Sequence, residues 1–61
     1  MNDRQRKAID YIKTYGKITK GKYMRINKVS HKTAYEELND LFNKNIIARQ
    51  GKGRATTYIF K

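Results

Sequence analysis

The sequence predicts a small α+β domain in which three helices and a short intervening strand precede a C-terminal β-hairpin. Apolar residues recur at helical spacing over residues 8–15 and 34–42. Residues 46–60 instead contain two runs rich in β-branched and aromatic residues, separated by a loop with two glycines. The 61 residues leave room for one domain only.

The composition excludes several classes of protein. Fifteen Lys or Arg against five Asp or Glu give a net charge of +10. With no cysteine and the single His31, the chain cannot form a disulfide framework or a structural zinc site, and we expect neither a metal nor a cofactor. The longest apolar runs have three residues, against the ~20 that a membrane helix needs, and the polar N-terminus does not resemble a secretory signal. We therefore expect a cytoplasmic domain without a membrane partner. Its positive net charge favours a polyanion as the binding partner.

The first helix is expected over residues 3–15. Asn2 is a suitable N-cap, and Gln5 three residues later completes a capping-box pattern. Gly16 is the expected residue just beyond the C-terminus. Residues 17–19 are too few for more than a bridging strand.

A second, short helix is expected over residues 20–25, capped by Thr19 and weakened by Gly21. Residues 26–29 then form a tight turn in which Asn27 tolerates left-handed backbone angles. Such a turn between two helices predicts a helix-turn-helix.

The third helix is the clearest element and is expected to run from its cap, Ser30, to about residue 44, before the terminator Asn45. One apolar stripe is formed by Ala34, Leu38, Leu41 and Phe42. At 100° per residue, the side chains that point away from this stripe are Lys32, Thr33, Glu36, Asn39, Asp40 and Asn43.

Strands are expected over residues 46–49 and 56–60, joined by a loop over 50–54 that contains Gly51, Lys52, Gly53 and Arg54. A basic hairpin after a helix-turn-helix is a wing, so the predicted fold is a winged helix-turn-helix.

The third helix of this fold, about 10–12 Å across, fits a major groove about 12 Å wide. The predicted partner is therefore double-stranded DNA, read by sequence or by structure through the third helix and the wing. The two glycines belong to the hairpin and do not form a nucleotide-binding loop, because neither a third glycine nor a following helix is present.

Three segments resemble winged helix-turn-helix domains of bacteria and archaea. They are the opening helix (NDRQRKAIDYI, 2–12), the third helix (VSHKTAYEELNDL, 29–41) and the hairpin (NIIARQGKGRATTY, 45–58). The combination is similar to the C-terminal domain of RecG-related, helicase-like proteins with a Schlafen-type ATP-binding domain, which are described as transcriptional regulators; similar domains end some Fic proteins. The resemblance implies DNA binding through the third helix and the wing. Because neither end looks like a linker, we expect residues 1–61 to be one domain at the C-terminus of a larger protein.

One departure from the family pattern concerns Glu36, where arginine is common. A carboxylate repels phosphate, although it can accept a hydrogen bond from cytosine N4. The first turn of the third helix and the wing are therefore the preferred DNA contacts. The expected nucleic-acid-binding residues are Lys20, Lys22, Arg25, Ser30, Lys32, Thr33, Tyr35, Lys52 and Arg54.

Two other interpretations stay open at this point. Glu36, Glu37 and Asp40 could form a docking face, which would make the domain a protein-interaction module, and a homodimer is also compatible with the sequence. Catalysis is not expected, because adjacent residues such as Ser30 and His31 do not face each other at the start of a helix. Most tyrosines are expected in the core: Tyr11, Tyr15, Tyr23 and Tyr58.

Overall fold

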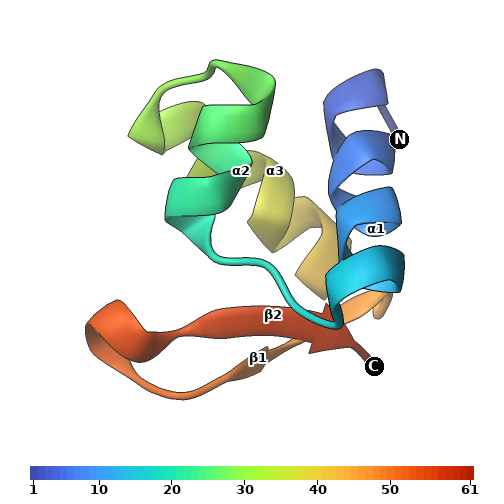
Figure 1. Cartoon of the computed structure of the whole chain (residues 1–61), viewed down its shortest axis with the longest axis vertical. Coiled ribbons are helices and arrows are strands. Elements are labelled where there is room, and N and C mark those ends of the chain that lie inside the picture. Colours follow the sequence, from blue (N-terminus) through green and yellow to red (C-terminus); the bar gives the residue numbers. More distant parts are fainter.

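The computed structural model describes all residues, 1–61, and contains three helices followed by a two-stranded antiparallel hairpin. Figure 1 shows α2 and α3 packed beside α1, with the hairpin running beneath them and its tip extending away from α1. This α+β layout is the winged-helix arrangement that the sequence predicts. No helix is long and apolar enough to cross a membrane.

The first helix, α1, spans Asp3–Tyr15 as predicted. The Asn2 side chain accepts from the Gln5 amide at 2.8 Å, and the Gln5 side chain accepts from the Asn2 amide at 2.9 Å, so the capping box is complete. Gly16 has φ +90° and donates its N–H to the Ile12 carbonyl at 2.7 Å, which ends the helix in the left-handed conformation.

The second helix, α2, spans Lys20–Asn27 and is longer at its end than the predicted 20–25. Thr19 caps it as expected. The left-handed residue is Lys28, at φ 54°, rather than Asn27. The Lys28 and Val29 amides both donate to the Met24 carbonyl, and these bonds end the helix two residues later than predicted.

The third helix, α3, spans His31–Asn43, and Ser30 accepts from the Thr33 amide as its N-cap. Asn45 ends the helix as predicted, with φ 62°. Its amide donates to the Phe42 carbonyl and that of Ile46 donates to the Leu41 carbonyl, which is the Schellman pattern. Because this cap uses Ile46, the following strand begins one residue later than predicted.

The wing consists of β1 (Ile47–Gln50) and β2 (Thr57–Phe60), with a 3₁₀ turn, η1 (Gly53–Ala55), between them. In the antiparallel register, Arg49 pairs with Tyr58. Ile18 joins the other side of β2 through two hydrogen bonds with Tyr58, of 2.9 and 2.7 Å, so the predicted bridging strand is present. At Gly51 a Cβ atom would lie 2.5 Å from the Ala55 carbonyl oxygen, so this turn requires glycine.

One core joins the three helices, the Ile18 bridge and the two strands. Its buried apolar residues are Ala8, Ile12, Ile18, Tyr23, Ala34, Leu38, Leu41, Ile47 and Tyr58. Two of the four tyrosines expected in the core belong to it, and Tyr11 packs against its edge. Tyr15 does not, since 67% of it is exposed. It lies at the last position of α1, beyond the surface that α2 and α3 cover.

Candidate nucleic-acid interface

The carboxylate of Glu37 is bound by three side chains within the domain. It accepts from Arg4 Nε at 2.9 Å, from Asn2 Nδ2 at 2.8 Å and from the Tyr23 hydroxyl at 2.6 Å, and its side chain is 12% exposed. The Arg4 hydrogen bond, assisted by those of Tyr23 and Asn2, lowers the pKa of Glu37 to about 2. Burial and the bond to Glu37 raise the pKa of Tyr23. One carboxylate thus ties α3 to both other helices.

Asp40 lies on the same flank of α3. It accepts from Gln5 Nε2 at 3.0 Å and pairs with Lys44 Nζ at 3.0 Å. The hydrogen bond from Gln5, followed by that from Lys44, lowers the pKa of Asp40. Asp40 points away from the apolar stripe as predicted and is half exposed, but the bond from Gln5 also ties it to α1. Since Glu37 is engaged internally, the predicted acidic docking face retains only the exposed Glu36 and the half-exposed Asp40, which pairs with Lys44.

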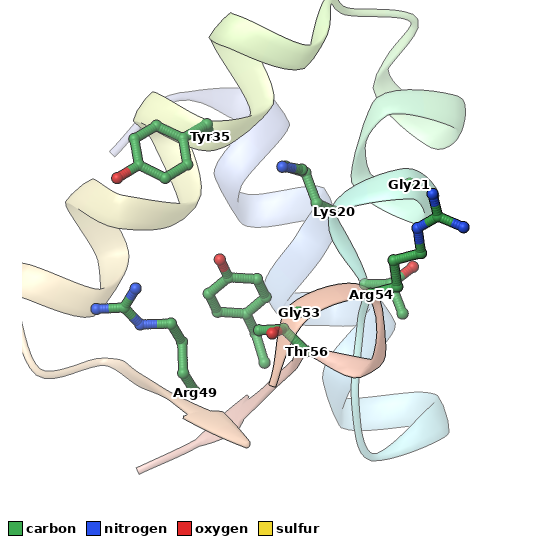
Figure 2. Close-up of a pocket in the computed structure, with 9 residues that line it drawn as sticks. Lys20, Gly21, Tyr35, Arg49, Gly53, Arg54 and Thr56 are labelled. Carbon is green, nitrogen blue, oxygen red and sulfur yellow. The ribbon is translucent and has the colours of Figure 1, made fainter. Parts of the chain in front are cut away.

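The opposite flank of α3 borders a basic hollow of about 690 Å³. Its cations come from three elements: Lys20 begins α2, Arg49 lies on β1, and Arg54 lies in η1. Figure 2 shows these side chains around the hollow, with Tyr35 of α3 across from the wing. No carboxylate lines the hollow. We call this set of residues, completed by Thr19, Gly21, Gly53, Thr56 and Tyr58, the basic hollow.

Contacts with α3 position two of these cations. The Lys20 ammonium lies 2.6 Å from Nε2 of His31 and 5.9 Å from the centre of the Tyr35 ring. The Arg49 guanidinium lies 4.2 Å from the centre of the Phe42 ring. The distances to the two aromatic rings are typical of cation–π contacts. Neither cation has a carboxylate partner, so both charges stay available to an anion.

Only some of the predicted contact residues meet at the basic hollow: Lys20, Tyr35 and Arg54. Lys32 and Lys52 are exposed, on the outer face of α3 and at the wing tip. Ser30 and the half-buried Thr33 bond to each other at the start of α3, so their side chains serve the cap first.

Two predicted contacts on α2 lie apart from the basic hollow. The Lys22 ammonium lies 5.9 Å from the ring of Tyr11, which places it against α1. Arg25 is exposed in the last turn of α2, at the end of the helix away from the hollow. Lys22 follows Lys20 by two residues, about 200° around the helix, so it faces α1 instead of the wing, and Arg25 lies more than one turn further along α2.

Sequence reasoning missed Arg49 and the role of Tyr58 in the basic hollow. Alternate strand residues share one face, so Arg49 lies on the same face of β1 as the buried Ile47. Tyr58 is directly opposite in the register. The signal available in the sequence was this alternation, which places an arginine on the helix-facing side of the hairpin just beyond the core.

Comparison with known proteins adds no assignment to this geometry. No protein-family model matches the chain, and no curated protein matches it significantly. The fold and the arrangement of charges around α3 and the wing are therefore the basis for a function.

Proposed function

We propose that the domain binds double-stranded DNA through α3 and the wing, without catalysing a reaction. The observation that carries this proposal is the separation of charge across α3. Glu37 and Asp40 are neutralised on the α1 flank, whereas Lys20, Arg49 and Arg54 surround the other flank without a carboxylate. A phosphate backbone needs such an acid-free basic surface.

The exposed side of α3 has the chemistry of a helix that enters the major groove. Lys32 and Tyr35 are exposed near its N-terminus, where free backbone N–H groups and the helix dipole favour phosphate. The wing adds Lys52 and Arg54, which both lie in the loop that joins its two strands. The helix would contact base edges while the wing and the start of α2 hold the flanking phosphates.

The resemblance noted in the sequence extends this proposal to the parent protein. We infer that the domain is the DNA-binding part of a transcriptional regulator or a helicase-related protein that acts in the cytoplasm. Association with a second copy or with other domains of such a protein is compatible with this role.

Charge reversal tests the proposal. The double variant Lys52→Glu/Arg54→Glu should weaken binding to a 20-base-pair duplex by at least 100-fold in fluorescence anisotropy at low salt, because two phosphate contacts become repulsive. The matched control is Arg6→Glu/Lys13→Glu, which makes the same change of charge on exposed positions of α1. An equal loss in both variants would show that net charge alone attracts the DNA and would contradict an interface at the wing.

A further inference from the structure

Tyr58 carries a polar group that the domain does not use. The residue is only 7% exposed and lines the basic hollow, yet its hydroxyl makes no hydrogen bond within the domain. No buried polar side-chain atom lacks a partner, so this hydroxyl is not sealed in the core. It must reach solvent, and the solvent-accessible surface beside it is the basic hollow. The hydroxyl is therefore free to exchange a water molecule for a ligand that enters the basic hollow.

The hydroxyl is available as a hydrogen-bond donor. Burial raises the pKa of Tyr58, although the nearby charge of Arg49 opposes this, so the phenol stays protonated at neutral pH. Tyr23, the other buried phenol, donates to Glu37. The contrast is informative because both hydroxyls come from core residues, and only the one at the basic hollow lacks an acceptor.

The remaining groups define the shape and charge of that ligand. Tyr35 is 48% exposed and borders the basic hollow, and a half-exposed ring offers a surface for stacking. Lys20, Arg49 and Arg54 require a negative charge. A volume of about 690 Å³ lies within the ~300–1,000 Å³ range of ligand pockets and exceeds what one backbone phosphate occupies.

We propose that the basic hollow receives one unpaired nucleotide of a DNA strand, with its base against Tyr35 and its phosphate among Lys20, Arg49 and Arg54. The Tyr58 hydroxyl then donates to an oxygen or ring nitrogen of that nucleotide. This inference rests on the proposed DNA binding and adds a preference to it, namely for duplexes with an extruded nucleotide. A strand is favoured over a free nucleotide because the basic hollow lies between α3 and the wing, the two elements proposed to hold the duplex (Figure 2).

The test compares two duplexes of one sequence, one fully paired and one with a single-nucleotide bulge of 2-aminopurine. We expect the bulged duplex to bind about tenfold more tightly, with quenching of the 2-aminopurine fluorescence, because stacking on an aromatic side chain contributes an effect of this size. The paired duplex reports on the proposed function separately. Binding of both duplexes with equal affinity and no quenching would overturn this inference while leaving the proposed function intact.

Three variants decide which groups produce the preference. Tyr35→Ala should reduce the affinity ratio of bulged to paired duplex to about 1, whereas Tyr35→Phe, which keeps the ring, should retain it. Tyr58→Phe, which removes only the hydroxyl, should lower the ratio severalfold. Tyr15→Ala, which removes an exposed tyrosine of α1, is the matched control and should not change it. A ratio that survives Tyr35→Ala would assign the preference to DNA bending and overturn the proposal.

A final arm separates the two sources of a nucleotide. Free dAMP at millimolar concentration should not displace the bulged duplex, since the strand also contacts α3 and the wing. The opposite result would be that dAMP shifts the NMR resonances of Tyr35 and Tyr58 while the bulged and paired duplexes bind equally. The basic hollow would then take a free mononucleotide, and the assignment to a strand would be wrong.

Discussion

The two flanks of α3 differ in how their polar groups are satisfied. On the α1 flank, the Glu37 carboxylate accepts from Arg4, Asn2 and Tyr23, and Asp40 accepts from Gln5 and Lys44. On the wing flank, three cations have no carboxylate and the Tyr58 hydroxyl has no partner. The first flank holds the fold together, whereas the second retains unpaired groups that can bind a ligand. Changes on the first should therefore act on stability, and changes on the second should act on binding.

The largest effect should come from Glu37→Gln. The variant loses the charge that pairs with Arg4 and weakens the charge-assisted bond from Tyr23, so we expect a loss of about 2 kcal/mol in the free energy of unfolding. For a domain of this size, that corresponds to a fall of roughly 10 °C in Tm. Thermal unfolding followed by circular dichroism measures it, with Glu36→Gln as the matched control, because the neighbouring carboxylate has no partner. Equal Tm values for Glu37→Gln and the unmodified domain would contradict a structural role for this flank.

The same carboxylate should make the domain sensitive to acid. The pKa of Glu37 falls from an ordinary 4.5 to about 2 in the folded state. A depressed carboxyl pKa stabilises the fold above the unfolded-state value, so this contribution is complete above about pH 5 and is lost as the pH falls from 4.5 towards 2. The loss should be somewhat smaller than in Glu37→Gln, because a protonated Glu37 keeps its shape and one accepting oxygen. Urea unfolding across this range should show a steeper acid dependence in the unmodified domain than in Glu37→Gln. Parallel curves would contradict the assignment.

On the wing flank, Arg49→Gln should weaken duplex binding about fivefold, or ~1 kcal/mol, through the loss of one phosphate contact. The slope of log K against log salt should become about 0.9 less negative. Because Arg49 has no carboxylate partner and loses only its contact with Phe42, Tm should fall by no more than about 5 °C, which is well below the fall expected for Glu37→Gln. A large fall in Tm with unchanged DNA affinity would reverse the roles assigned to the two flanks.

The smallest effect is expected at Glu36, the exposed carboxylate on the proposed DNA-facing side of α3. Glu36→Gln removes a repulsive charge and should raise the affinity for duplexes of random sequence about threefold. Asp10→Asn is the control, since it removes a carboxylate from the exposed surface of α1. A loss of affinity in Glu36→Gln that is confined to one sequence would show instead that Glu36 reads a cytosine.

Much of the fold could be predicted because its signals are local. The capping box of Asn2 and Gln5, the Ser30 cap and the Asn45 terminator each act within a few residues, and they placed the helix ends to within two residues. The apolar stripe of α3 identified the core. These features depend on backbone hydrogen bonds and helical periodicity, which neighbouring residues decide.

The site was less predictable because it depends on contacts between distant residues. Glu37 and Arg4 are 33 positions apart, and nothing near Glu37 in the sequence indicates that α1 covers it. Arg49 contributes to the basic hollow only through the register that pairs it with Tyr58. Lys22 and Arg25 are close to Lys20 in sequence, but Lys22 lies on the opposite side of α2 and Arg25 lies more than one turn further along it. Helix direction and packing, rather than residue type, decide which cations lie at the basic hollow.

The most direct test of the central claim, that the wing flank of α3 binds DNA, is a salt titration of duplex binding. With about five phosphate contacts, log K should fall linearly with log salt at a slope near −4.5, and in Lys52→Glu/Arg54→Glu the slope should be smaller in magnitude by about 2. A slope near zero, or an identical slope in that variant, would contradict the account.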